Sequence, residues 1–182
     1  FRKAGFEVVP FADRADVYVV NTCTVTQIGD KKSRQLIRRA HAKNPDAVIV
    51  AAGCYVQASP SEAAAIPGVA VVSGTQDRAG IVRAVIGLTE REGAPAVLVS
   101  DIGECRSYEE LPSEGTAERA RAYVKIEDGC ENFCSYCRVP YVRGPVRSRD
   151  FERIREEVLR LADRGFREII LTGIDLGAYG RD

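Results

Sequence analysis

Short apolar runs rich in β-branched residues alternate with segments of helical periodicity over residues 1–100, and this alternation limits the possible folds more than any other feature. Runs of this kind are typical of buried parallel strands, whereas apolar residues at i, i+3, i+4 and i+7 indicate amphipathic helices. We expect strands at 7–9, 16–20, 47–51, 69–72 and 96–100, and helices at 30–40, 60–65 and 77–86. The pattern predicts an α/β fold with a small, doubly wound parallel sheet.

The helix at 30–40 illustrates the expected two-sided pattern. Asp30 is expected to be its N-cap, and its core face is expected to consist of Ser33, Leu36, Ile37 and Ala40. Cations line the opposite side, at Lys31, Arg34 and Arg38. A charge run of this kind is usually a solvated face, and its functional interpretation is a stripe that contacts phosphate groups.

A second domain is predicted after a polar stretch at 101–120, which lacks clear periodicity and is interpreted as a linker. A strand at 122–126 is followed by a loop with three cysteines, by a helix that begins after Asp150 and ends at Gly165, and by a strand at 168–171. This order predicts that 121–182 forms one βαβ unit of a parallel barrel or sheet.

Composition and charge exclude some classes of protein. Lys plus Arg and Asp plus Glu both number 26, so a nucleic-acid surface would have to come from local clustering and not from net charge. No apolar run approaches the ~20 residues that span a bilayer, so we expect a cytoplasmic protein without a membrane partner. The chain starts at Phe1 and contains no methionine, and we therefore expect a piece of a longer protein that lacks both ends.

Cys130, Cys134 and Cys137 stand in one loop, at spacings of four and three residues. Three thiolates can hold an inorganic centre and leave one coordination position open for a small molecule, whereas four favour a closed structural site. We interpret the loop as an iron–sulfur catalytic site. The alternative is a structural zinc knuckle without its fourth ligand, which the sole histidine, His41, is too remote in sequence to supply. Disulfides are a weaker alternative, because the size of the chain and its core pattern favour reduced thiols.

Two further cysteines, Cys23 and Cys54, each follow a predicted buried strand. Because the carboxyl ends of parallel strands meet at one edge of a sheet, we expect both thiols at the edge where open α/β sheets bind ligands. A lone thiol at such a place is more often a small buried hydrophobe, and two thiols cannot hold a cluster by themselves. Cys105 has no partner by spacing and is interpreted as incidental.

Three separated motifs carry a resemblance to a known family. The sequence G-C-E-N-F-C-S-Y-C-R-V-P-Y-V-R-G at 129–144, which continues to R-S-R at 147–149, closely resembles the cluster loop of the radical S-adenosylmethionine methylthiotransferases. N-T-C-T-V-T at 21–26 with K-S-R-Q at 32–35, and G-C-Y at 53–55, resemble the same family. The motifs occur in the family's order and the resemblance covers essentially the whole chain.

The resemblance implies a methylthiotransferase N-terminal domain followed by the first βαβ unit of a radical-SAM partial (β/α) barrel. It implies two [4Fe–4S] clusters, one on the three-cysteine loop and an auxiliary one to which Cys23 and Cys54 would contribute, with a third ligand upstream of this chain. S-adenosylmethionine would bind the first cluster, with Tyr136 near its adenine and the loop at Gly173 near its methionine end. A chain of this extent is expected to be inactive alone.

The implied reaction inserts sulfur and transfers a methyl group, which leaves a methylthio group on the substrate; the resemblance names no electron donor. The chain looks most like the branch that modifies N6-threonylcarbamoyladenosine in tRNA, beside the anticodon; branches acting on isopentenyladenosine or on a ribosomal-protein aspartate are the runners-up. With tRNA as partner, the cations expected to make RNA or structural contacts are Lys31, Arg34, Arg38, Arg143, Arg147 and Arg149. The alternative of another class is a zinc-stabilised RNA-binding module without catalysis.

Overall fold

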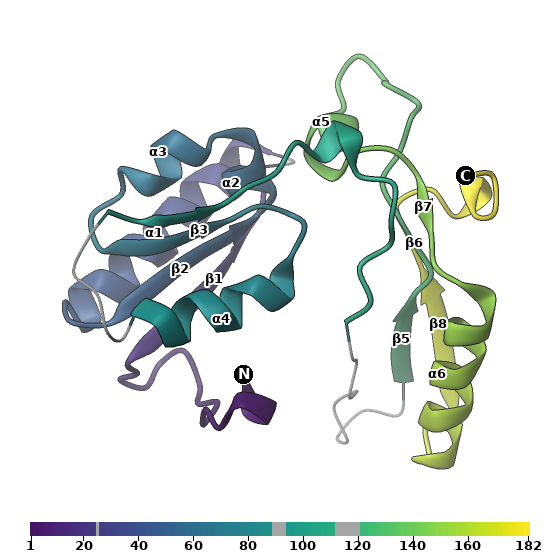
Figure 1. Ribbon diagram of the computed structural model, residues 1–182, viewed down its shortest axis with the longest axis horizontal. Helices are drawn as coiled ribbons and strands as arrows, with labels where there is room; N and C mark the ends of the chain where they lie inside the picture. Colours follow the sequence, from purple (N-terminus) through teal and green to yellow (C-terminus); the bar gives the residue numbers. More distant parts are fainter. Residues whose placement is uncertain (25, 89–93, 112–120) are drawn as a thin grey trace. The chain divides into compact units, whose positions relative to one another are not determined.

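The computed structural model describes residues 1–24, 26–88, 94–111 and 121–182. The chain forms two compact units, Phe1–Ile102 and Gly103–Asp182, each with its own core (Figure 1). The order of strands and helices confirms the predicted α/β class, because each unit contains parallel strands connected through helices.

A four-stranded parallel sheet forms the centre of the first unit. Its strands lie in the order β1-β2-β3-β4, which is also their order in the chain. In the register of the first pair, Thr22 lies opposite Gly53, so β1 and β2 end side by side at the same edge. The strands are β1 (Val17–Thr22), β2 (Val48–Gly53), β3 (Val69–Ser73) and β4 (Ala96–Leu98).

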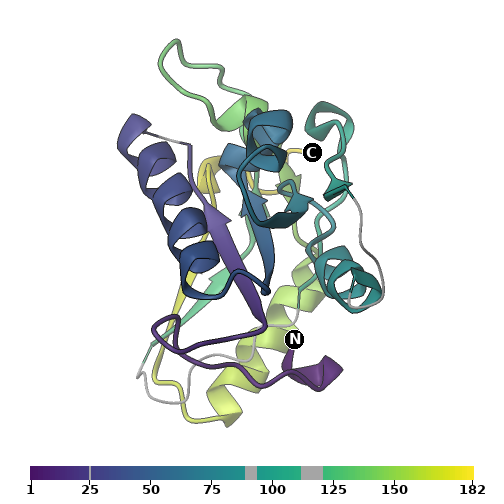
Figure 2. The ribbon, with the colours of Figure 1, turned by 90° about the vertical axis from the view of Figure 1, so that its left-hand side faces the viewer.

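Helices cover both faces of this sheet, as a doubly wound arrangement requires. Alternate side chains of a strand point to opposite faces, and β2 shows this directly: Ile49 packs with Ile37 and Tyr55, whereas Val50 packs with Ile81. One face is covered by α1 (Gln27–Lys43), α2 (Cys54–Ala58) and α3 (Pro60–Ala64), and the other by α4 (Arg78–Leu88). Figure 2 shows α1 alongside β1.

Three details of the first unit differ from the prediction. Thr26 and not Asp30 caps α1, because the Thr26 hydroxyl accepts a hydrogen bond from the Gly29 N–H and the helix starts at Gln27. Leu36, expected in the core, is 40% exposed, since the narrow contact with the sheet is filled by Ile37 and Ala40. Residues 7–9 form no strand; they follow a short 3-10 helix, η1 (Arg2–Ala4), that Gly5 ends with a φ of 85°.

The second unit contains the predicted βαβ element. The strands β5 (Arg121–Lys125) and β8 (Glu168–Thr172) pair in parallel, and α6 (Phe151–Asp163) connects them and packs Ile154 and Leu161 against β5. Asp150 caps α6, as expected, by accepting a hydrogen bond from the Arg153 N–H. The remaining elements are β6 (Glu127–Asp128), α5 (Val139–Arg143), β7 (Arg147–Ser148) and two 3-10 helices, η2 (Ile102–Glu104) and η3 (Leu176–Ala178).

The segment expected to be a linker, 101–120, is described at 101–111. Residues 112–120 lie outside the described residues, whereas 103–111 pack on the second unit. The Tyr108 hydroxyl donates a hydrogen bond to the carbonyl of Lys125, at 3.0 Å. Among the residues that the structure describes, no helix is long and apolar enough to cross a bilayer.

Candidate functional site

The three cysteines lie on a loop, residues 129–146, whose two ends are joined by the antiparallel pairing of β6 with β7. The Cys130 N–H donates a hydrogen bond to the Gly144 carbonyl at 3.0 Å, and this bond closes the loop just above the pairing. Gly129 has a φ of 92°, and a Cβ at this position would lie 1.8 Å from the Pro145 carbonyl oxygen. Only glycine can therefore start this cysteine loop.

Asp128 is the centre of a cluster of charges at the base of the cysteine loop. Its carboxylate pairs with Lys125 from β5, with Arg143 from α5 at 3.2 Å and with Arg147 from β7 at 3.8 Å, and it also accepts the Gly129 N–H. Burial would raise the pKa of Asp128, but the charges of Lys125 and the two arginines outweigh burial and hold the pKa below its usual value. The ion pairs thus tie three elements to the start of the loop.

Glu127, the neighbour of Asp128 in β6, faces the loop that follows β8. Its side chain is fully buried, and its Oε2 accepts hydrogen bonds from the Ile174 N–H at 2.7 Å and the Asp175 N–H at 2.9 Å. Burial raises the pKa of this carboxyl, although the bonds from Asp175 and Ile174 oppose the rise. We call residues 173–175 the Gly173 loop.

The cysteine side chains differ in exposure. Cys134 is exposed, Cys130 and Cys137 are half-buried, and Tyr136 is 88% exposed. All six cysteines lie in the described part of the chain and none of them forms a disulfide, so the donor chemistry fits an iron–sulfur cluster. Within residues 1–24, 26–88, 94–111 and 121–182 no three potential ligands are close enough to hold a metal ion. Cys130, Cys134 and Cys137 therefore lie on one loop, but their side chains are not arranged as the ligands of a metal site.

Cys23 and Cys54 lie where the strand pattern predicts, directly after the paired ends of β1 and β2. Cys23 is exposed and its N–H donates to the Ser33 hydroxyl of α1, whereas Cys54 is the buried first residue of α2. Cys105 belongs to the second unit by its position and donates its thiol to the Ser107 carbonyl. His41 lies in the last turn of α1.

Of the arginines expected to make RNA or structural contacts, Arg143 within the cysteine loop and Arg147 and Arg149 after it make ion pairs inside the second unit. Arg147 is 1% exposed and Arg149 is 8% exposed, and Arg143 pairs with Asp128. Arg149 binds the Glu110 carboxylate at 2.8 Å and also pairs with Glu157. This geometry matches the structural interpretation of Arg147 and Arg149.

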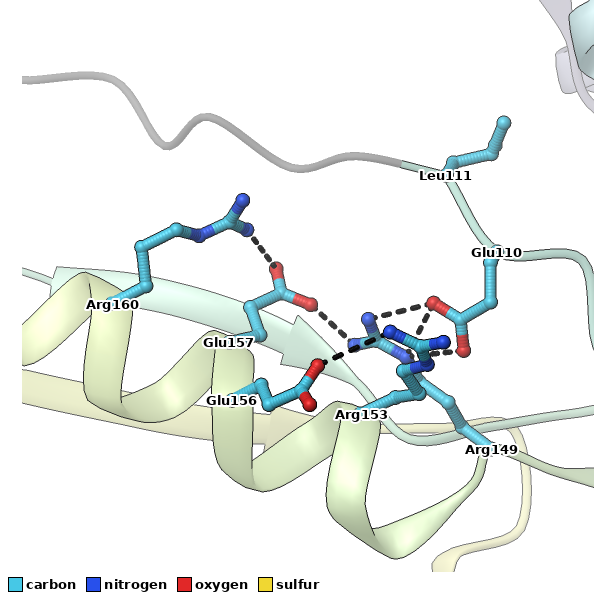
Figure 3. A pocket seen from close by; sticks show the side chains of 7 residues that line it. All are labelled: Glu110, Leu111, Arg149, Arg153, Glu156, Glu157 and Arg160. Carbon is cyan, nitrogen blue, oxygen red and sulfur yellow. Dashed lines mark hydrogen bonds and ion pairs between the residues drawn. The ribbon is translucent and has the colours of Figure 1, made fainter.

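Arg149 borders a cavity of about 300 Å³ between α6 and the segment that contains Glu110 (Figure 3). Figure 3 shows three arginines and three glutamates around it, joined by ion pairs: Glu110, Arg149, Arg153, Glu156, Glu157 and Arg160. Because the charges of these side chains balance, the cavity offers no excess positive charge to a phosphate group.

The cations of α1 are more accessible. Lys31 and Arg38 are exposed, whereas Arg34 is half-buried with its guanidinium 5.5 Å from the centre of the Tyr55 ring. Arg34 thus connects α1 with the segment around Cys54 through a cation–π contact.

Two family models match the chain. The model described as Uncharacterized protein family UPF0004 matches residues 1–74, and the model of the Radical SAM superfamily matches residues 124–179, which include the cysteine loop. A threonylcarbamoyladenosine tRNA methylthiotransferase (MtaB) of Bacillus subtilis (strain 168) is 51% identical over the whole chain. The chain is thus similar over its whole length to radical S-adenosylmethionine methylthiotransferases. A match to the Radical SAM superfamily implies S-adenosylmethionine and an iron–sulfur cluster.

The names of the similar proteins indicate different substrates. MtaB of Aquifex aeolicus (strain VF5) is 42% identical over the whole chain, which covers 44% of that protein. A tRNA-2-methylthio-N(6)-dimethylallyladenosine synthase of Wolbachia pipientis subsp. Culex pipiens (strain wPip) is 34% identical over 96% of the chain and is covered to 40%. The chain likewise spans 40% of the length of the Bacillus relative.

Sequence reasoning missed Glu127, Asp128 and Glu110. The signal was present for the first two, because two acidic residues stand directly between a buried strand and the first cysteine, where an apolar or turn residue is the usual choice. A buried acidic pair implies partners, but only the tertiary structure shows which ones.

We predict that Asp128→Asn lowers the free energy of unfolding by about 3 kcal/mol, because it leaves the buried Arg147 without its counter-charge while keeping the acceptor for the Gly129 N–H. Glu156→Gln removes the exposed pair with Arg153 on α6 and should cost less than about 1 kcal/mol. Urea unfolding followed by circular dichroism measures both, and equal losses in the two variants would contradict the role of Asp128.

Proposed function

We propose that this chain is part of a tRNA-modifying enzyme that forms a methylthio group on N6-threonylcarbamoyladenosine beside the anticodon. The observation that carries the proposal is the cysteine loop, with three free thiols on a base held by buried ion pairs, inside the segment matched by the Radical SAM model. The substrate is supported by two relatives, 51% and 42% identical, that are threonylcarbamoyladenosine tRNA methylthiotransferases. The site of action would be the cytoplasm, where tRNA is modified.

Cys130, Cys134 and Cys137 would hold one [4Fe–4S] cluster, and Cys23 and Cys54 would contribute two ligands to an auxiliary cluster. A cluster held by these thiols would supply one-electron reduction of bound S-adenosylmethionine. The chain's own task is to bind and orient. Tyr136 is exposed enough to pack on the adenine, and the Gly173 loop, held by Glu127, would approach the methionine end.

The metal content of protein purified without oxygen tests this proposal. We expect iron and sulfide, a cluster spectrum that shifts when S-adenosylmethionine is added, and loss of that shift in Cys134→Ala. Cys105→Ala is the matched control and should keep both iron and shift, because Cys105 lies outside the cysteine loop. Stoichiometric zinc without iron or sulfide would favour the zinc-stabilised RNA-binding module and refute the enzyme.

The substrate is tested with the complete protein, both clusters reconstituted, on tRNAs that carry either N6-threonylcarbamoyladenosine or isopentenyladenosine. We expect the methylthio product by mass spectrometry of the digested nucleosides only with the first tRNA. Product only with the second tRNA, or only on a ribosomal protein, would assign the chain to another branch of the family.

The exposed cations of α1 are proposed to contact the tRNA backbone. Replacing Lys31 and Arg38 together by alanine should weaken tRNA binding and flatten the dependence of log K on log salt by about 1.5, because two phosphate contacts are lost. The matched control is Arg153→Ala with Arg155→Ala on α6, two exposed cations of another element. Filter binding over a range of salt concentrations measures the slope, and equal slopes in both double variants would leave α1 as a solvated face.

A further inference from the structure

We propose that Glu127 is a positioning residue that fixes the Gly173 loop to the base of the cysteine loop. It would act through the backbone of Ile174 and Asp175 and would not touch the reacting atoms. The inference rests on the proposed function, because it assigns to Glu127 the task of making one S-adenosylmethionine site from two segments that are distant in the sequence.

Glu127 holds the Gly173 loop through two hydrogen bonds to its backbone, which we call the Glu127 clamp. One carboxylate oxygen, Oε2, accepts both consecutive N–H groups that follow Gly173, at 2.7 and 2.9 Å. These N–H groups lie beyond the last paired residue of β8, Thr172, so the ladder with β5 does not satisfy them. A charged acceptor makes stronger hydrogen bonds than a neutral one, and full burial excludes competing water. Glu127 thus determines the path of the chain as it leaves the sheet.

Because Gly173 has no side chain, the Glu127 carboxylate can lie close to its backbone. A Cβ at Gly173 would lie 2.6 Å from Glu127 Oε2, 2.9 Å from Leu176 Cδ2 and 3.2 Å from Glu127 Cβ, all closer than normal contact. The close approach of Glu127 and Leu176 therefore favours glycine here, whereas its own φ angle does not require it because it is not in the left-handed region. This is a physical reason for the glycine that turn chemistry alone does not provide.

Glu127 and Asp128 serve the two loops from one short strand. Successive side chains of a strand point in opposite directions, so Asp128 faces the ion pairs of the cysteine loop while Glu127 faces the Gly173 loop. A second connection supports the clamp: the Asn132 side chain, within the cysteine loop, donates a hydrogen bond to the Asp175 carboxylate at 3.0 Å. The two loops are consequently joined at Asp175 through both its backbone and its side chain.

Burial of the charged Glu127 side chain carries a desolvation cost. The Glu127 carboxyl is fully buried, its pKa is raised by burial, and its second oxygen, Oε1, makes no hydrogen bond in the described part of the chain. An apolar side chain of similar volume would avoid the cost of burying the charge. It would also release the two N–H groups of the Gly173 loop.

Two substitutions exploit this difference. Glu127→Gln keeps an oxygen at the position that accepts both N–H groups and places its amide nitrogen where Oε1 has no partner. Glu127→Leu fills the volume but removes the acceptor. Glu157→Leu is the matched control, because Glu157 is also a buried carboxylate of the second unit, 5% exposed, yet it pairs with Arg149 away from the Gly173 loop.

The experiment uses the complete protein and two readouts. Amide hydrogen exchange at Ile174 and Asp175, measured without S-adenosylmethionine, should become at least about ten-fold faster in Glu127→Leu and stay within about three-fold of wild type in Glu127→Gln. The affinity for S-adenosylmethionine, measured by equilibrium dialysis, should fall at least about ten-fold in Glu127→Leu and remain within about three-fold in Glu127→Gln and Glu157→Leu.

Wild-type exchange and wild-type affinity in Glu127→Leu would overturn the inference, and so would an equal loss of affinity in Glu157→Leu. The exchange readout is independent of the proposed function, because it needs neither cluster nor cofactor. A wild-type protein that fails to bind S-adenosylmethionine would refute the proposed function while the exchange rates still decide whether Glu127 holds the Gly173 loop.

Discussion

The arrangement of the second unit depends on the ion pairs that the buried Asp128 carboxylate makes with Lys125, Arg143 and Arg147. A carboxylate that is almost completely withdrawn from water must find compensating charge, and here the compensation comes from β5, α5 and β7 together. Because these elements flank the cysteine loop, the requirement to neutralise one acid also fixes the base of the loop. The exposed part of the loop, with Cys134 and Tyr136, is left free of this network.

Glu127, on the other side of β6, is also a buried carboxylate whose charge must be compensated. Burial raises the pKa of Glu127 because its backbone N–H partners only partly oppose the effect, whereas the cations around Asp128 outweigh burial and hold its pKa below the usual value. A two-residue strand with buried acids on both faces would be unstable alone. Its pairing with β7 and its contacts with the Gly173 loop give each acid a partner.

Much of the fold followed from the sequence because it depends on local patterns. Runs of β-branched residues predicted β1 to β5 and β8 to within two or three residues, although the strand expected at 7–9 does not form. The cap at Asp150 was correct because its hydrogen bond is local. The cap of α1 was wrong, since Thr26 and Asp30 are both good caps and the choice depends on how the chain leaves β1. The exposure of Leu36 was missed because periodicity shows the apolar face of a helix but not the width of its contact with the sheet.

The sequence by itself determined the α/β class, the placement of Cys23 and Cys54 after adjacent strands, and the loop with three thiols, because periodicity and spacing are encoded locally. Only the tertiary structure decided which charges are buried, which of the arginines after the loop are held in ion pairs, and why Gly173 is glycine. Those properties depend on side chains brought together from residues far apart in the chain. Burial and long-range pairing, not residue type, therefore decide the roles of Glu127, Asp128 and Arg147.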